Sequence, residues 1–362
     1  MNKEMMMVST LPIKPQIKTN IGMMIAPTIM DFIGNVFEIE KNIGFNILHT
    51  YSNKKLELDT YLNYVNDSGI KYDSIFIDEN KAQDLLEIIY QMYINGFIKE
   101  KEEKLLRCEC GMVDMIYSPT NSAKLYTFIN EKPYCNHCKK ECKASIEKSL
   151  VFEIDRQIED MSIVPLYLKK EIEELSKKFV NTDILVSKKR NTGYSLNINN
   201  KMYNIDIDFL WSNYFKLYNK KRQIYIASNH QIFNMYLMSY LSKITSTKEL
   251  MFIASPYIKT DLDMAKKQYE LRKMKEYKAL LLLYNLKWKG KDCIWSDSVM
   301  NYLIGISNTK IENLYKAMIL SSRDMTNNIA TFDECVFEIL NNETRMQTNI
   351  KTMKKLYKEE RL

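Results

Sequence analysis

The residues whose types and spacing could do chemistry are, first of all, cysteines. Five of the seven cysteines lie between residues 108 and 142: Cys108, Cys110, Cys135, Cys138 and Cys142. Cys135 and Cys138 form a C-x-x-C pair, and Cys108 and Cys110 form a tighter pair in which the following Gly111 permits a turn. Zinc prefers four soft ligands in a tetrahedron, and paired cysteines on tight turns supply them two at a time. We therefore predict a zinc site with Cys108, Cys110, Cys135 and Cys138 as ligands.

A site with four protein ligands leaves no open coordination position, so the predicted zinc is structural and not catalytic. Cys142 and His137 are alternative ligands. A set of free surface thiols is the competing interpretation, but five cysteines in one polar segment are improbable by chance, and a chain without a secretion signal is expected in a reducing compartment. Cys293 and Cys335 stand alone in segments with a helical pattern, where a cysteine is typically a small core residue.

Several other kinds of site are excluded by the glycines and histidines. No two of the nine glycines are closer than ten positions, whereas a P-loop needs two that are five apart and a dinucleotide fingerprint needs three within six residues. The chain has only three histidines and no G-x-S-x-G segment. A glycine-rich phosphate loop of either kind and a nucleophile elbow are therefore absent, and a three-histidine metal site is not expected.

Composition favours an ordinary globular protein. Of the 362 residues, 46% are apolar and 27% are charged, and the length suggests two or three domains. The net charge is 52 − 45 = +7, which allows a polyanionic partner without requiring one. No run of eighteen apolar residues is present, and the N-terminus lacks the apolar segment of a signal peptide. We expect a cytoplasmic protein with no membrane partner.

The segments that must position the cysteines alternate between strand and helix patterns. Before the cysteines, the predicted elements are strands at 23–28, 45–51 and 74–77, a helix at 31–41, and an amphipathic helix from Asp78 to Asn95-Gly96. After them, the predicted elements are a helical segment at 150–180, strands at 224–227 and 250–254, and a helix at 231–241. Residues 1–20, with their methionine-rich start, are expected to be a disordered arm. The alternation predicts a parallel α/β sheet interrupted by a charged insertion at 100–146.

This order of elements resembles the class I aminoacyl-tRNA synthetases, most of all the methionyl type, over roughly residues 20–300. The first matching segment runs from Ala26-Pro27 to Ile33-Gly34-Asn35 and is similar to the proline-led strand end and His-x-Gly-His signature of that family. Phe32 stands in place of the first histidine, and Asn35 stands in place of the second.

The second signature of the family, a Lys-Met-Ser-Lys-Ser loop, is similar to residues 263–267. Met264 and Lys266 match, and Asp263 replaces the first lysine. Weaker matches are the helix before the zinc-bearing insertion at 72–98, an Ile-Ser-Arg-like segment at 183–193, a segment around Trp211 like one that lines the amino-acid pocket, and Ile226-Ala227-Ser228-Asn229 in place of Gly-Lys-Asp.

The resemblance implies ATP as cofactor, and an amino acid, its aminoacyl adenylate and tRNA as ligands. It also implies site residues on the matching positions. These are Asn35 and Lys266 as catalytic groups; Gly34, Asn35, Lys266 and Lys267 as nucleotide-binding residues; and Ala26, Pro27 and Trp211 as lining of the amino-acid pocket. In the family such groups stabilise the charge that develops on the phosphates of ATP.

The departures from the family pattern fall on that same set of phosphate-binding groups. Phe32 offers no hydrogen-bond donor, and Asp263 would repel a phosphate; the loss of one donor of this kind costs on the order of 10²–10³ in rate. We therefore predict a repurposed or pseudo-synthetase that binds an amino acid, an adenylate or a tRNA end. The alternatives are an active, specialised aminoacyl-tRNA ligase or amino-acid-adenylating enzyme, and a zinc-stabilised protein-interaction module.

The expected fold is α/β, with a Rossmann-like parallel-sheet nucleotide-binding core split by a zinc-knuckle insertion and followed by a C-terminal helical bundle. The predicted parts are 1–100 and 183–268 for the two halves of the core, 101–182 for the insertion, and 269–362 for the helical domain. That domain is short for reading an anticodon. The basic run Lys188-Lys189-Arg190 is a candidate contact for the acceptor end of a tRNA, or a solvated turn.

Overall fold

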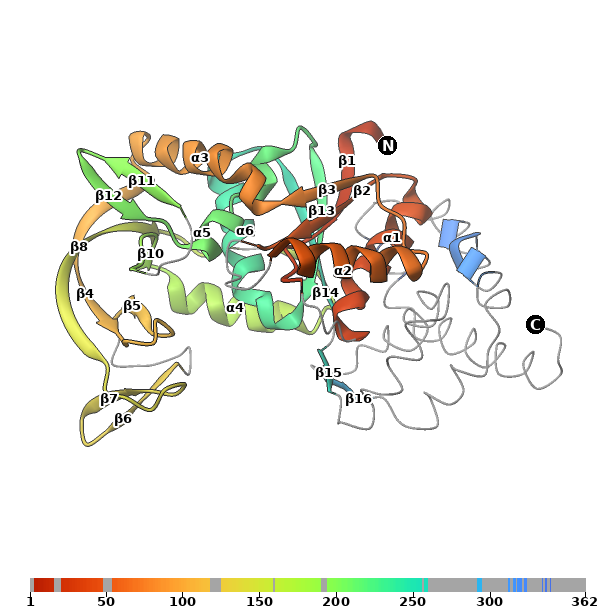
Figure 1. Cartoon of the computed structure of the whole chain (residues 1–362). Helices are drawn as coiled ribbons and strands as arrows, with labels where there is room; N and C mark the ends of the chain where they lie inside the picture. The colour runs from red at the N-terminus through yellow and green to blue at the C-terminus, as the bar shows by residue number, and fades with distance from the viewer. Residues whose placement is uncertain are drawn as a thin grey trace. The chain divides into compact units, whose positions relative to one another are not determined.

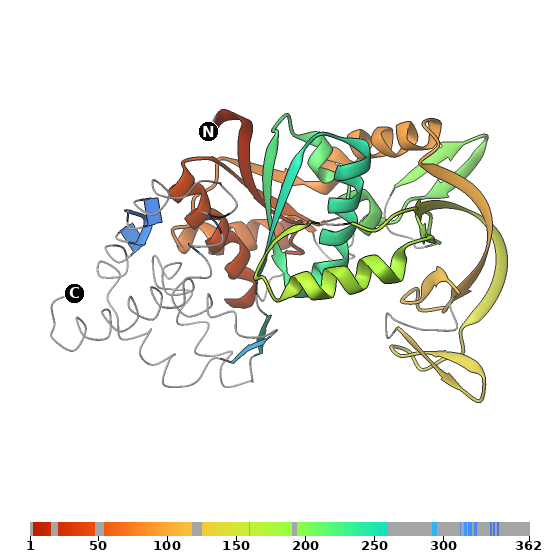
Figure 2. The same cartoon turned by 180° about the vertical axis from the view of Figure 1, so that it is seen from behind.

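The computed structural model describes residues 3–15, 21–47, 54–117, 125–158, 160–189, 194–255, 257–259 and 292–294, and scattered positions between 312 and 339. The chain divides into two compact units (Figures 1 and 2). The first unit comprises Met1–Glu79, Asp160–Ile172 and Tyr218–Leu362, and the second comprises Asn80–Glu159 and Glu173–Leu217. The four parts predicted from the sequence stay a prediction.

The first unit is built on a six-stranded sheet in the order β3-β2-β1-β13-β14-β9. Each pair of neighbouring strands is parallel. The strands are β1 (Met6–Thr10), β2 (Glu40–Phe45), β3 (Ser74–Ile77), β9 (Ser162–Val164), β13 (Arg222–Ser228) and β14 (Glu249–Ser255). This sheet confirms the predicted Rossmann-like α/β core.

Helices lie on both faces of this sheet, with α1 (Ile25–Phe37) and α6 (Ile232–Thr245) on opposite sides (Figures 1 and 2). Alternate residues of the strands, among them Val8, Ile43 and Ile224, face α1 and form one apolar core with it. Helix α2 (Lys54–Asp67) adds to that core through residues such as Tyr61. The β-branched side chains on this face of the strands are therefore buried in the core.

Three elements in the N-terminal part of the chain differ from the sequence prediction. Residues 6–10 form the buried strand β1 near the middle of the sheet, where Met7 and Val8 are fully buried, so the expected disordered arm is wrong. Residues 23–28 are not a strand, because α1 begins at Ile25. Pro27 fits there because the amide groups of a helix's first turn have no intrahelical partner to lose. The strand predicted at 45–51 lies earlier, at β2, and ends at Phe45.

Several other elements confirm the prediction. Strand β3 lies at 74–77, and β13 and β14 flank helix α6 in the chain. In the second unit, α3 (Ala82–Ile94) has Asn95 as its C-cap, and Gly96 follows with a φ of +78°, a left-handed conformation that favours glycine. Of the helical segment predicted at 150–180, only α4 (Leu168–Phe179) forms; β8 and β9 occupy part of the rest.

The second unit contains a four-stranded antiparallel sheet in the order β10-β8-β4-β5. Its long strands, β4 (Ile98–Arg107) and β8 (Lys143–Ile154), pair from Ile98 opposite Phe152 to Arg107 opposite Lys143. The other strands are β5 (Asp114–Ile116), β10 (Thr182–Leu185) and the hairpins β6 (Tyr126–Ile129) with β7 (Lys132–Cys135) and β11 (Ser195–Ile198) with β12 (Lys201–Asn204). Helix α5 spans Ile207–Trp211.

The predicted C-terminal helical bundle lies mostly outside the described residues. The described positions between 312 and 339 are helical, and a short parallel pair joins β15 (Tyr257–Lys259) to β16 (Asp292–Ile294). Within the part of the chain that the structure describes, no helix combines the length and apolar character that crossing a bilayer would need.

Candidate functional site

The four predicted zinc ligands come from two turns of the second unit. Cys108 and Cys110 follow β4, in a turn where the Gly111 amide donates to the Cys108 carbonyl at 2.9 Å and Gly111 has a φ of +74°. Cys135 ends β7, and Cys138 lies in the next turn, where the Lys139 amide donates to the Cys135 carbonyl at 2.9 Å. Each turn presents two sulfur atoms, as the spacing predicts.

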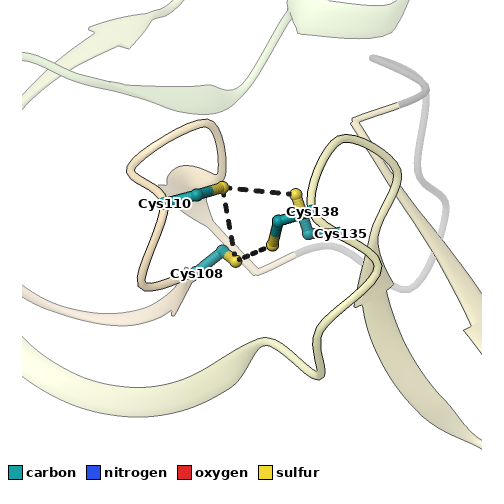
Figure 3. Close-up of side chains that lie close together, drawn as sticks. All are labelled: Cys108, Cys110, Cys135 and Cys138. Carbon is teal, nitrogen blue, oxygen red and sulfur yellow. Dashed lines mark hydrogen bonds between the residues drawn. The ribbon is translucent and has the colours of Figure 1, made fainter.

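The structure brings these four sulfur atoms together (Figure 3). All four Sγ atoms lie within 4.8 Å of one another. The Sγ of Cys108 is 3.0 Å from that of Cys138, and the Sγ of Cys110 is 3.5 Å from Cys108 and 3.7 Å from Cys135. Zinc–sulfur bonds of about 2.3 Å in a tetrahedron place the sulfur atoms roughly 3.8 Å apart, so the residues fit a zinc ion.

The alternative ligands are outside this group. Among the described residues, the set of side chains able to hold a metal together contains four cysteines and neither Cys142 nor His137. Cys142 is buried and packs with Leu106, Val113 and Tyr126 in the apolar cluster that surrounds Cys108 and Cys135. Cys142 is therefore part of the packing that holds the two turns in place.

The thiols differ in how readily they ionise. Burial raises the pKa of Cys108, whereas the hydrogen bond from the Cys108 thiol lowers the pKa of Cys138 to about 7. Cys138 is thus ionised in part at neutral pH, and the thiolate is the form that binds a metal. The ammonium of Lys140, two residues after Cys138, lies 3.2 Å from the carboxylate of Glu109.

The residues predicted to bind nucleotide occupy a different setting. Gly34 and Asn35 lie near the C-terminal end of α1. The Asn35 amide donates to Asp31 Oδ1 at 2.9 Å and lies 3.3 Å from the hydroxyl of Tyr315, and its carbonyl oxygen accepts from Lys41 Nζ at 3.1 Å. Asn35 therefore belongs to a polar cluster inside the first unit. Its role in binding ATP stays a prediction.

Phe32, at the position of the first signature histidine, is buried in the same unit. Its ring lies 6.1 Å from that of Tyr315, centroid to centroid. Lys266 and Lys267 fall outside the described residues, so the structure does not place them with Asn35.

The predicted amino-acid pocket draws on both units. Ala26 and Pro27 lie in the first turn of α1 in the first unit, and Pro27 is buried. Trp211 ends α5 in the second unit and is 6% exposed. The joint role of these three residues in an amino-acid pocket stays a prediction.

The carboxyl edge of the sheet carries Thr10, which the sequence did not single out, beside Ser228, which it did. In open parallel sheets, ligands bind there at the point where the strand order reverses. That point lies between β1 and β13, because β2 and β3 extend one way and β14 and β9 the other. The residues at this edge include Thr10, whose hydroxyl accepts from the Gly44 amide at 2.9 Å, and Ser228, which caps the short helix Asn229–Gln231. The apolar run of β1 followed by Pro12 is the pattern that could have located this edge.

No family model and no curated protein matches the sequence. The methionyl-tRNA synthetase of Mycobacterium tuberculosis in complex with methionyl-adenylate matches in structure, with a TM-score of 0.60 and 11% identity over 90% of this chain and 72% of that one. The apo form of the Mycobacterium tuberculosis enzyme gives a TM-score of 0.61 at 9% identity, over 97% of this chain and 81% of that one.

The chain has a class I aminoacyl-tRNA-synthetase-like fold. Against this synthetase-like fold, the parallel sheet corresponds to the expected nucleotide-binding core, and the cysteine cluster corresponds to the expected zinc knuckle. At identities of 9–11% the likeness is one of fold, so the activity has to be argued from the site itself.

Proposed function

We propose that this synthetase-like protein is a repurposed synthetase that binds an amino acid, an aminoacyl adenylate or a tRNA end, without activating the amino acid. The observation that carries the proposal is the reversal of strand order between β1 and β13, in a fold like that of a structure holding methionyl-adenylate. The carboxyl ends of these two strands are where such a sheet binds a nucleotide.

The side chains support the loss of activation. Catalysis of adenylate formation needs donors that point at the ATP phosphates. Asn35 instead hydrogen-bonds Asp31 and Lys41 inside the first unit, and Phe32 packs in the apolar core. Ser228 and Asn229, in the place of the family's Gly-Lys-Asp segment, form the cap and first residue of a short helix. These contacts favour structural roles at positions where the family has phosphate-binding groups.

Structural zinc in the knuckle is part of the same proposal. Cys108, Cys110, Cys135 and Cys138 would hold the ion, and the ion would join the turn after β4 to the turn after β7. A closed four-thiolate site stabilises local folding and leaves no position for a substrate.

Contact of tRNA with the basic run finds less support. Lys188 Nζ lies 2.8 Å from Asp206, and Lys189 Nζ lies 2.9 Å from Glu147, while Arg190 is outside the described residues. Two of the three cations are thus paired with carboxylates, which favours the solvated-turn interpretation over binding of a phosphate backbone.

Amino-acid-dependent ATP–pyrophosphate exchange tests the loss of activation. The assay uses zinc-loaded protein of verified fold and all the proteinogenic amino acids. The proposal expects no exchange above the protein-free control with any of them. Exchange with one amino acid would establish instead an active, specialised ligase and identify its substrate.

A further inference from the structure

A pocket of about 270 Å³ lies in the first unit, away from the carboxyl edge of the sheet. It is lined by the first residues of three strands: Arg222 of β13, Glu249 of β14 and Ser162 of β9. Since these parallel strands all start at one edge, the pocket opens at the amino edge. The proposed adenylate site lies at the opposite edge, so the two sites are distinct.

The second wall of the pocket is the C-terminal half of α6, with Ser239, Ser242 and Lys243, followed by Lys248. Ser239 and Ser242 are buried, and the Ser242 hydroxyl donates to the Lys248 carbonyl at 2.8 Å. This hydrogen bond holds the Lys248 backbone against the helix. Two serines and two lysines therefore line one side of the pocket.

The charges of the lining leave a positive excess. Arg222 Nε donates to Glu249 Oε2 at 2.8 Å, so these two residues offset each other. Lys243 Nζ donates to the backbone carbonyl of Asp160 at 3.3 Å, and Lys248 Nζ donates to the backbone carbonyl of Tyr218. With the arginine–glutamate pair set aside, the charged residues of the lining are Lys243, Lys248 and Asp160.

The C-terminal end of a helix carries partial negative charge, which would oppose the binding of an anion. In α6 this charge is reduced by local hydrogen bonds. The Thr245 hydroxyl donates to the Leu241 carbonyl at 2.6 Å, and the Ser246 hydroxyl donates to the Ser242 carbonyl at 3.1 Å. Burial also lowers the pKa of Lys248, because a desolvated ammonium is costly, and a nearby anion would offset that cost.

We infer that this pocket binds a small phosphate-bearing molecule, with Lys243 and Lys248 on the phosphate oxygens and Ser239 as a neutral donor. Phosphate is favoured over a carboxylate because its oxygens accept from several directions at once, and here the donors come from a helix and from the segment after it. The volume of about 270 Å³ accommodates a phosphate and a small organic group.

Isothermal titration calorimetry of the full chain at constant ionic strength tests the inference. Inorganic phosphate and glycerol 3-phosphate are the two probes, and malonate is the dianion without phosphorus. Saturable binding of at least one phosphate probe, tighter than malonate, is expected. Tighter binding by glycerol 3-phosphate than by inorganic phosphate would identify an organic phosphate as the occupant, and the reverse would identify the free ion. No saturable heat with either probe would overturn the inference, as would equal binding of malonate.

The variant Lys243→Ala/Lys248→Ala should weaken phosphate binding at least about tenfold, because it removes two charge-assisted contacts. Its matched control is Lys170→Ala/Lys177→Ala, which removes two exposed lysines of α4 outside the pocket and should leave the affinity within about twofold. Unchanged affinity in the first variant would place the phosphate elsewhere, including the adenylate site, and would refute the assignment. Binding of an adenylate analogue should be unchanged in that variant, so the two proposals fail independently.

A variant that should bind phosphate more tightly separates an effect on binding from a loss of folding. Asp160 has a φ of +57°, a conformation that asparagine adopts readily, so Asp160→Asn should fold normally. Removal of this carboxylate should tighten phosphate binding about threefold, because the anion no longer meets a like charge. Unchanged or weaker binding in this variant would contradict the proposed geometry.

Discussion

The ammonium of Lys41 lies 3.2 Å from the carboxylate of Asp31 in the interior of the first unit. The Asp31 side chain is fully buried, and that of Lys41 is 11% exposed. The pair joins β2 to α1, and the Tyr315 hydroxyl donates to the other oxygen of Asp31 at 3.1 Å. A charged residue in a central strand is therefore explained by a partner ten positions away.

Removal of one member of this pair should be far more costly than removal of both. Lys41→Met leaves a buried carboxylate without its cation and should lower the free energy of unfolding by about 3–5 kcal/mol. Asp31→Asn/Lys41→Met should recover much of that loss. Urea unfolding of the single and double variants measures the coupling. Lys81→Met is the control, because Lys81 pairs with Asp84 at an exposed site and should cost less than about 1 kcal/mol. Strictly additive effects at positions 31 and 41 would contradict the account.

Gly34 provides a test of how Lys41 is placed. A Cβ at position 34 would lie 2.2 Å from Lys41 Cγ, so Gly34→Ala should displace the lysine stem and destabilise the protein by about 1–3 kcal/mol. In the Lys41→Ala background the obstacle is gone. There the same change should stabilise by about 0.5–1 kcal/mol, because alanine favours a helix more than glycine does. The free energies of unfolding of the four proteins measure both effects. A Gly34→Ala change of the same sign in both backgrounds would contradict the contact between position 34 and the Lys41 stem.

Zinc binding should depend on four cysteines and not on the fifth. Cys135→Ser should reduce the zinc content of freshly purified protein from about one ion per chain to well below that, because three thiolates hold zinc much more weakly than four. Cys142→Ala is the matched control, since Cys142 is buried beside the cluster but outside the ligand group, and should keep the full content. Elemental analysis measures both. Zinc-free wild-type protein, or loss of zinc in the Cys142 variant alone, would contradict the ligand set.

Glu147 should contribute to stability in a pH-dependent way. Burial opposes its ionisation, but hydrogen bonds from Lys189 and Ser145 and the charge of Arg107 outweigh burial and lower the pKa of Glu147 to about 2. A carboxyl whose pKa is lower in the folded state stabilises above its unfolded pKa, and the contribution is lost as pH falls toward the folded value. Glu147→Gln should thus reduce stability at pH 7, and the difference from wild type should shrink from pH 4.5 to pH 3. Acid-driven loss of zinc affects both proteins alike. A difference that does not change with pH in urea unfolding would contradict this assignment.

The cysteine site could be predicted from the sequence because its geometry is local. Two cysteines on each tight turn fix the positions of two sulfur atoms, and only the meeting of the turns depends on the fold. Helix α3 could also be predicted from the sequence, because its apolar residues form one stripe. In α1, by contrast, 11 of 13 residues are buried, and the apolar run at its start resembles a buried strand, so the sequence predicts a helix only from residue 31.

The contacts of Asn35 could not be found from the sequence. Its neighbours include Tyr315, which is 280 positions away, and no periodic pattern links residues so far apart. Likewise β1 is covered near the centre of the sheet, so it lacks the alternation that identifies a half-exposed strand. The motif match predicts Asn35 at a phosphate, and that role stays a prediction; its contacts in the structure are with Asp31, Lys41 and Tyr315.

The central claim, binding of an adenylate without amino-acid activation, is tested most directly by titration of the zinc-loaded protein with non-hydrolysable aminoacyl-adenylate analogues. The panel covers all the proteinogenic amino acids, with adenosine as the reference ligand. The account predicts saturable binding of at least one analogue, at least about tenfold tighter than adenosine. Folded protein that binds none of the analogues more tightly than adenosine would contradict the account and leave the fold as an interaction module.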